Sequence, residues 1–411
     1  MNKGITFLFL LLILFCSCNR ETRIIIDNLS SLSRIDEIVE VDLNQLPCSL
    51  LIQKRSVALF NEDNIEIPYQ VTYDRKFIFP ASVVAFGKST YTIRKCIPKN
   101  NVPYVGGRLY PERLDDIAWE NDISAYRVYG PALQHKGEHN YGYDIWTKSV
   151  PDLVVEKRYR MELDSVSLYK IDSLRKNGLR EKADSLVREI SYHVDHGDGM
   201  DCYNVGPTLG AGTAALMLDS VLLYPYCFEE YEILDNGPLR FTVCLKFPAV
   251  SYDKLGDVRE ERLISLDKGS LLNYTEVYYK YLQCPLPIAV GIVIHPQNPN
   301  GYYCNKEKGI IAYVDSTNST TSGNGVIYIG AVVTSPLSEA SISLFDEKGQ
   351  KMQQGALGHV LAIGNYSPGQ RYTYFWGGCW SKRCKFTPES WLEELNKFRI
   401  KIDTPVNIKI E

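Results

Sequence analysis

The chain has 411 residues, of which 45% are hydrophobic and 23% are charged, and its formal net charge is -4 at pH 7. This composition is that of a globular protein, and the slightly acidic balance gives no electrostatic reason to expect a nucleic-acid partner. The length allows one large domain or two ordinary ones.

The first eighteen residues predict export. Lys3 precedes the apolar run ITFLFLLLILF, which is too short to span a bilayer comfortably, so we interpret it as a signal peptide. Ser17 before Cys18 suits a lipoprotein signal peptidase, which predicts lipidation of Cys18; a plain secretory peptide cut elsewhere is the alternative. A lipid-anchored chain belongs to the bacterial cell envelope, periplasmic or outward-facing. We expect a monomer with no other membrane contact.

Residues 19–109 are dominated by strand-like segments. RIIIDNLS, EIVEVDL, SVALFN, IEIPYQVTYD and KFIFPASVVAF are short and rich in β-branched and aromatic residues. The stretch ALFNEDNIEIPYQV is typical of a β-hairpin. We therefore expect a β-sandwich of roughly eighty residues at the start of the chain.

The segment RLDDIAWENDISAYRVYG places charged residues around one tryptophan. Trp119 could stack on a sugar ring, while Asp116 and Glu120 could bind vicinal hydroxyls. Arg113 is a further candidate for substrate binding, and Arg127 could form a bidentate pair with a uronate carboxylate. Alternatively, the acidic residues form turns and Trp119 belongs to the core.

The polar segment QHKGEHNYGYDIW follows, with His135, Tyr143 and Trp146 as candidates for covering a saccharide. Exposed loop histidines often have no function, which is the alternative. Next comes the one long helical segment, at about 159–190, with apolar residues at helical spacing. Asn177-Gly178 is expected to break it into two helices. We expect this insert to pack on the body of the protein or to act as a lid.

The segment YHVDHGDGMDCYNVG is the densest in glycine and ionisable residues. Its glycines permit positive φ and close approach to a ligand. One of His193 and His196 could act as general base or acid beside Asp198 and Asp201, with Tyr203 just beyond. A polar structural loop is the alternative. His193, His196 and Asp198 could also bind a divalent metal, although the spacing matches no standard zinc signature, and no other cofactor is indicated.

Strand-like segments fill most of the chain after this loop, and TPESWLEELNKF is clearly helical, with Thr387 as N-cap. Trp376 and Trp380 in YTYFWGGCW could form another sugar-stacking wall or could belong to the core. Cys379 and Cys384 are close enough in sequence for a disulfide in an oxidising periplasm. So many consecutive strands favour one antiparallel assembly over 110–411, which we expect to be continuous with 19–109.

Several segments together resemble a known family. PERLDDIAWENDISAYRVYGPAL, YGYDIWTKSV, YHVDHGDGMDCYNVGPTLGAG, DNGPLRFTV, SLDKGSLLN and TYFWGGCW, in this order, resemble exported bacterial proteins of domain of unknown function 4861. The resemblance covers nearly the whole mature chain. It implies a mainly β fold: a large antiparallel β super-sandwich, galactose-mutarotase-like, with a helical insertion and a short C-terminal helix. It also implies polysaccharide utilisation in Bacteroidetes, which narrows the ligand to carbohydrate but not the reaction.

Three function classes remain open. The first is β-elimination at a uronate by a lyase or a related dehydratase, with His196 or His193 as base, Arg127 as neutraliser and Tyr203 as acid. The second is glycoside hydrolysis by two carboxylates, drawn from Asp116, Glu120, Asp195, Asp198 and Asp201. The third is glycan binding without catalysis. The histidine-rich loop favours elimination over hydrolysis, and hydrolysis over binding alone.

Overall fold

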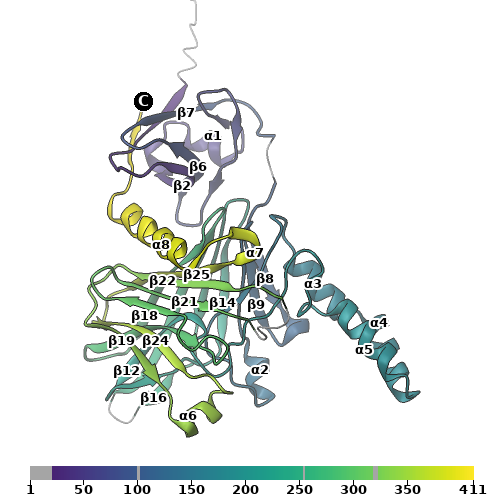
Figure 1. The fold of residues 1–411 in the computed structure, drawn as a ribbon. Coiled ribbons are helices and arrows are strands. Elements are labelled where there is room, and N and C mark those ends of the chain that lie inside the picture. Colours follow the sequence, from purple (N-terminus) through teal and green to yellow (C-terminus); the bar gives the residue numbers. More distant parts are fainter. Residues whose placement is uncertain (1–20, 100–101, 253–254, 318–322) are drawn as a thin grey trace, which may run out of the picture.

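The computed structural model describes residues 21–99, 102–252, 255–317 and 323–411. The expected signal peptide and Cys18 lie outside the described residues. Within those ranges, no helix is both long and apolar enough to cross a membrane. Antiparallel sheets are the main elements of the described chain, and Figure 1 shows them as a small N-terminal unit beside a larger body.

The N-terminal unit is built from a five-stranded sheet and a three-stranded sheet. The first contains β26 (Asn407–Ile410), β1 (Thr22–Asp27), β7 (Lys88–Arg94), β3 (Ala58–Phe60) and β4 (Glu66–Ile67). The second contains β2 (Arg34–Asp42), β6 (Lys76–Val83) and β5 (Gln70–Val71), with a 3-10 turn (Leu43–Gln45) and α1 (Ser49–Gln53) beside it.

Buried apolar residues alternate with more exposed residues along these strands, and the buried ones form a core within the N-terminal unit. In β1, Ile24 and Ile26 are completely buried and pack with Phe77 and Phe79 of β6 in one apolar cluster. The last strand of the chain, β26, pairs with β1 in antiparallel register, with Ile24 opposite Ile410. The C-terminus therefore completes the sheet with which the described chain begins (Figure 1).

Two stacked antiparallel sheets form the larger body. The five-stranded sheet contains β13 (Val221–Leu223), β12 (Ala211–Leu218), β19 (Leu286–Ile294), β24 (Gly358–Tyr366) and β23 (Glu339–Leu344). The nine-stranded sheet contains β14 (Glu230–Asn236), β15 (Arg240–Lys246), β16 (Val250–Tyr252), β17 (Gly256–Asp267), β18 (Leu272–Lys280), β25 (Tyr372–Trp380), β22 (Ile327–Val333), β21 (Ile310–Asp315) and β20 (Tyr302–Asn305).

The space between these sheets is the main core. β19 of one sheet contacts β21 and β22 of the other, and fully buried Ile288, Ile292 and Ile329 belong to one cluster. A further four-stranded sheet packs against it and contains β8 (Gly106–Tyr110), β9 (Asp116–Glu120), β10 (Ala125–Val128) and β11 (Asp144–Trp146). The short helices of this region are η2 (Pro111–Arg113), α2 (Pro131–His135) and α6 (Glu347–Met352).

The helical insert consists of α3 (Val155–Glu162), α4 (Ser165–Lys176) and α5 (Arg180–Ile190). The break expected at Asn177-Gly178 separates α4 from α5, with Gly178 at φ +72°. A second break precedes α4, where the Asp164 side chain accepts a hydrogen bond from Ser167 N at 2.8 Å. Only α3 packs on the sheets; α4 and α5 extend away from them, so they do not act as a lid (Figure 1).

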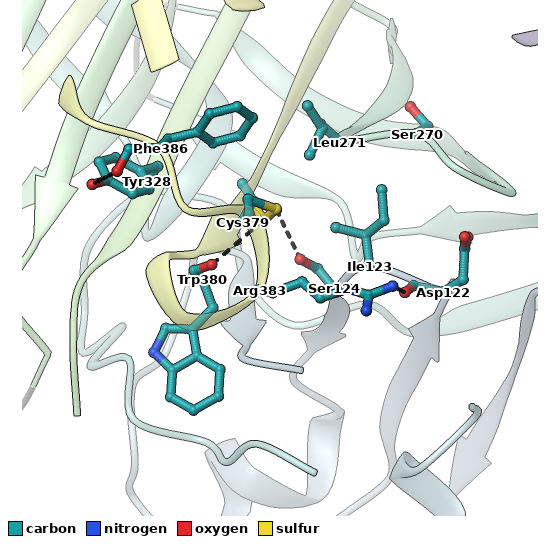
Figure 2. Close-up of a disulfide and its surroundings, with 12 residues drawn as sticks. Asp122, Ile123, Ser124, Ser270, Leu271, Tyr328, Cys379, Trp380, Arg383 and Phe386 are labelled. Atoms are coloured by element: carbon teal, nitrogen blue, oxygen red, sulfur yellow. Dashed lines mark hydrogen bonds between the residues drawn. A yellow bond between two sulfur atoms is a disulfide. The ribbon is translucent and has the colours of Figure 1, made fainter. Parts of the chain in front are cut away.

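The C-terminal segment ties the units together. After β25, a disulfide between Cys379 and Cys384 closes the turn that holds α7 (Ser381–Cys384), as expected. Figure 2 shows this turn beside the loop after β9, where Arg383 Nη2 donates to Asp122 O at 3.2 Å. The long helix α8 (Pro388–Asp403) begins with the predicted Thr387 cap and lies between the nine-stranded sheet and the N-terminal unit.

These sheets confirm the expected fold class. The protein is mainly β, its large body is an antiparallel sandwich, and a helical insertion and a C-terminal helix complete it.

Candidate functional site

A buried arginine lies at the centre of the residues that the sequence singled out. Arg127 Nη2, on β10, donates to Asp201 Oδ2 at 2.9 Å and also to Asp144 Oδ2. Its Nε lies 3.9 Å from Asp116 Oδ2. All four side chains are at most 5% exposed. One guanidinium is therefore held by three carboxyl groups from β9, β11 and the loop after α5.

Burial changes the protonation of this cluster. It raises the pKa of Asp116 to about 7 and that of Asp144 to about 6, because desolvation outweighs the attraction of Arg127. The same carboxylates hold the pKa of Arg127 well above its usual value. Since Arg127 is already paired with three acids, it cannot act as the expected neutraliser of a uronate carboxylate, and that assignment is corrected.

Polar atoms of this cluster are left with unused hydrogen-bonding capacity. Among the described residues, Arg127 Nε and Nη1, Asp116 Oδ2, Asp144 Oδ1 and the Tyr159 hydroxyl are buried without a hydrogen-bond partner. Such atoms in native structures are commonly satisfied by internal water. The carboxyls of Asp116 and Asp144 are completely buried and face Arg127, so they form part of an interior ion cluster.

The ring of each histidine in the glycine-rich loop is hydrogen-bonded to a backbone carbonyl oxygen. His193 Nδ1 lies 2.9 Å from Asp201 O, and His196 Nε2 lies 3.0 Å from Ser191 O. Asp198 instead pairs with Lys157 at 2.9 Å. Within the described ranges, no group of three or more histidine, cysteine or acidic side chains could hold a metal ion. The geometry therefore gives no support to a metal site at these three residues.

Gly199 of this loop and Gly210, which follows the loop, serve close packing. Gly199 has φ +103°, and a Cβ there would lie 2.2 Å from Thr147 O. Gly210 has φ +57°, and its Cβ would lie 2.3 Å from Tyr143 O. Only glycine permits both the backbone conformation and the approach at these positions. The chain therefore packs closely against both ends of β11. This fixes the position of Tyr203, which lies between Gly199 and Gly210 in the sequence.

The expected aromatic platforms are core residues. Trp119, Trp146, Trp376, Trp380 and Tyr143 are each no more than 1% exposed. The rings of Tyr143 and Trp376 stack on each other at 3.9 Å, and Trp119 Nε1 donates to Asn273 at 2.8 Å. Their faces are already covered, so they offer no surface to a sugar. The stacking interpretation is therefore wrong for Trp119, Trp376 and Trp380, and Tyr143 and Trp146 do not cover a saccharide.

Three further candidates have structural contacts. Both oxygens of Glu120 accept hydrogen bonds at the start of α3, from Val154 N and Val155 N at 2.9 and 2.8 Å, and Glu120 also pairs with Lys148 at 2.7 Å. Arg113 Nε donates to the Tyr192 hydroxyl at 2.9 Å. His135 is exposed at the end of α2. The structure does not bring these residues together.

Tyr203 leads to a pair that the sequence reasoning missed. His295 follows β19 and Asp315 ends β21, and His295 Nδ1 is hydrogen-bonded to Asp315 Oδ2. The Tyr203 ring lies 5.5 Å from the His295 ring, edge to face. Among the described residues, the Tyr203 hydroxyl has no hydrogen-bond partner, although it is buried. We call Tyr203, His295 and Asp315 the Tyr203 triad.

Further strained or unsatisfied polar groups lie beside the Tyr203 triad. Thr317 N donates to Asp315 Oδ1 at 2.6 Å, and Thr317 has φ +61°, an uncommon conformation for a β-branched residue. His359 Nε2 accepts from Leu209 N at 3.1 Å, while burial and the nearby His295 lower the pKa of His359 to about 3. His359 is therefore neutral at physiological pH.

The Tyr203 triad has the chemistry of an acid and a base. With Asp315 accepting from Nδ1–H, Nε2 is the nitrogen of His295 that can take up a proton. Burial holds the pKa of Tyr203 well above its usual value, so its hydroxyl is protonated before any reaction. A sequence signal existed: His295 and Asp315 are ionisable residues that close two apolar strands. Their pairing depends on the stacking of two different sheets.

Several known proteins match most of the length of this chain. Uncharacterized protein P7 of Formosa agariphila is 25% identical over 316 residues, which are 75% of this chain and 70% of that protein. A glycosyl hydrolase family 38 protein of Enterococcus faecalis covers 95% of this chain at 8% identity, with a TM-score of 0.45. An alpha-mannosidase of Enterococcus faecalis V583 covers 95% at 8% identity, with a TM-score of 0.41.

The chain spans about half the length of these two solved structures, 47% and 46%. Because their TM-scores are below 0.5, these two structures do not establish the fold or the reaction of this chain. The family comparison is more extensive, because the model described as Domain of unknown function (DUF4861) matches residues 26–408. The chain therefore belongs to the DUF4861 family.

Proposed function

We propose that the protein is an exported carbohydrate-active enzyme that cleaves uronate-containing oligosaccharides by β-elimination, with the Tyr203 triad as its reaction centre. The observation that supports this most is the unpartnered hydroxyl of Tyr203, among the described residues, beside the His295–Asp315 pair. Export through the signal peptide and anchoring through Cys18 belong to the proposal.

The two proton transfers of an elimination match these side chains. His295 Nε2 takes the proton from the carbon alpha to the substrate carboxylate and becomes imidazolium. The C–O bond to the leaving sugar breaks, a C=C bond conjugated to the carboxylate forms, and the Tyr203 hydroxyl protonates the leaving oxygen. A proton passing from the His295 imidazolium to the Tyr203 phenolate restores both groups, so the cycle consumes no other reactant.

Charge on the substrate carboxylate needs stabilisation during this step, and Arg127 is not available for it. A neutral donor lies beside Asp315 of the triad. The Thr317 hydroxyl has no hydrogen-bond partner among the described residues, and Thr317 N donates to Asp315 Oδ1 at 2.6 Å. Hydrogen bonds from preorganised donors stabilise developing negative charge in a water-poor site.

Carbohydrate as the substrate class rests on the segments that resemble the family and on the acid–base chemistry of the triad. Hydrolysis by paired carboxylates is less well supported, since each candidate carboxylate is paired with a basic side chain: Asp116 and Asp201 with Arg127, Glu120 with Lys148, Asp198 with Lys157 and Asp195 with Lys382.

Product analysis tests the proposal. The protein is incubated with a panel of uronate oligosaccharides, and ultraviolet absorbance of the conjugated double bond is followed together with the release of reducing ends. Elimination raises both signals, and His295→Gln abolishes both. His196→Gln is the matched control, because His196 is exposed and hydrogen-bonds to Ser191 O rather than to the triad. Reducing ends without absorbance would refute elimination and favour hydrolysis.

A further inference from the structure

A groove of about 700 Å³ lies where the N-terminal unit meets the large body. Its floor is the outer face of the nine-stranded sheet, with Thr242, Ser265 and Tyr274. One wall comes from β2 and the turn at Tyr73, and the other from α8. Figure 1 shows α8 between the unit and the sheet. This volume is within the range of small-molecule sites, about 300–1,000 Å³.

Hydrogen bonds between the units fix the shape of the groove. Gln70 Oε1 accepts from Leu239 N and Arg240 N, both at 2.8 Å, and Tyr73 N donates to Asp235 Oδ1 at 2.9 Å. At the other end, Arg34 Nη2 donates to Thr404 O at 2.5 Å. The walls are therefore held in place without a ligand, which lowers the entropic cost of binding one.

The charges that line the groove exclude an anionic ligand. Seven acidic and four basic residues line it. Each basic residue is paired with an acid: Arg240 with Glu40 and Asp267, Lys268 with Asp36, Lys397 with Glu394, and Lys401 with Glu37. An anionic sugar would meet excess negative charge and, among the described lining residues, no unpaired cation. A neutral ligand incurs neither cost.

The remaining groups suit a sugar. Tyr73 is 47% exposed, and the half-buried Tyr274 ring lies 5.3 Å from Phe375, so aromatic faces are available to the C–H face of a pyranose. Glu276 accepts from the Tyr274 hydroxyl at 2.6 Å and from Arg371 Nη1 at 2.8 Å, and each carboxylate oxygen retains a lone pair for a further donor. Paired guanidinium and carboxylate groups offer donors and acceptors side by side, as vicinal hydroxyls require.

From this geometry we infer that the groove is a second carbohydrate site, which binds a neutral segment of the glycan chain two or three sugars long. The inference rests on the carbohydrate class of the proposed function but not on the reaction at the Tyr203 triad. The groove holds the polymer by an uncharged stretch while a uronate of the same or another chain is processed elsewhere.

Calorimetric titration of the full mature protein tests this with xylotriose, mannotriose and maltotriose as neutral probes and trigalacturonate as the anionic one. At least one neutral trisaccharide should bind at millimolar concentration or below, more tightly than trigalacturonate. Glu276→Gln and Glu40→Gln, on the floor and one wall, should each weaken that binding at least tenfold. Glu261→Gln is the matched control, because Glu261 pairs with Lys280 outside the groove.

Three results would overturn the inference: no binding by any neutral trisaccharide, unchanged binding by both groove variants, or tighter binding of trigalacturonate. Failure of the proposed function has a different signature. Tyr203→Phe is expected to lose turnover and keep trisaccharide binding, whereas Glu276→Gln is expected to lose that binding and keep turnover of a short uronate substrate.

Discussion

Replacing Asp116 by asparagine is expected to change how stability depends on pH. Burial raises the pKa of Asp116 from 3.8 to about 7 in the folded protein. Between these values the folded state binds more protons than the unfolded state, so this group makes stability fall as pH rises. A pKa difference of about three corresponds to about 4 kcal/mol at 1.4 kcal/mol per pKa unit, reached when Asp116 is fully ionised.

The amide that Asp116→Asn introduces cannot ionise, and its oxygen can still accept the hydrogen bond from Gly130 N that Asp116 Oδ1 accepts at 3.3 Å. The variant should therefore not show this fall in stability as the pH rises. Urea unfolding is followed by tryptophan fluorescence at a series of pH values, and the stability of Asp116→Asn minus that of the wild type is plotted against pH. The difference should grow by about 4 kcal/mol from roughly pH 4 to pH 8.

Asp172→Asn is the matched control, because Asp172 is an exposed carboxylate on α4 that pairs with Lys176 at 2.5 Å. Its stability is measured at the same pH values, as the comparison for an exposed carboxylate. If the Asp116→Asn profile runs parallel to that of the wild type, Asp116 is ionised at its ordinary pKa and the argument from burial fails.

Three other substitutions test separate features. Glu120→Gln leaves the fully buried Lys148 without its anion and should cost about 3–5 kcal/mol in urea unfolding; a loss near zero would refute the buried pair. Burial lowers the pKa of His359 to about 3, so the unfolded state takes up the proton first and stability falls as pH drops from about 6.5. His359→Gln should remove that acid-side slope, and a retained slope would contradict it. Cys384→Ser opens a loop with sequence separation 5 and should cost about 2 kcal/mol; reductant should cost the wild type as much and the variant nothing.

Local patterns predicted the elements of the fold. The break predicted at Asn177-Gly178 separates α4 from α5, and the Thr387 capping residue starts α8 where expected. The turn at Asp235–Pro238 joins β14 to β15 because its residues favour a tight reversal whatever lies around them. By contrast, nothing local shows that β26 joins β1, since that pairing brings together the two ends of the chain.

Burial of the tryptophans could not be read from their neighbours in sequence. Trp119 is surrounded in sequence by acids, but in space it stacks on Phe241, 6.0 Å away on β15. Its sequence neighbours Asp116 and Glu120 are themselves buried against Arg127 and Lys148. The cluster of charged residues in the sequence therefore indicated a surface. Tertiary packing instead buries these residues in an interior network of ion pairs.

The candidate site was found only in part for the same reason. The loop with Tyr203 was recognised from its glycines and ionisable residues, and it does reach the Tyr203 triad. The His295–Asp315 pair joins strands of two sheets, β19 and β21, which are brought together only by packing of the sandwich. Composition of one strand at a time carries no information about such a contact.

Turnover of Tyr203→Phe tests the central claim most directly. The substitution removes one hydroxyl that has no hydrogen-bond partner among the described residues, so stability should be unchanged or slightly higher. Loss of the proton donor should lower the rate of formation of the unsaturated product by about 10²–10⁴-fold. A Tyr203→Phe protein that is folded and forms product at the wild-type rate would contradict the role of the Tyr203 triad.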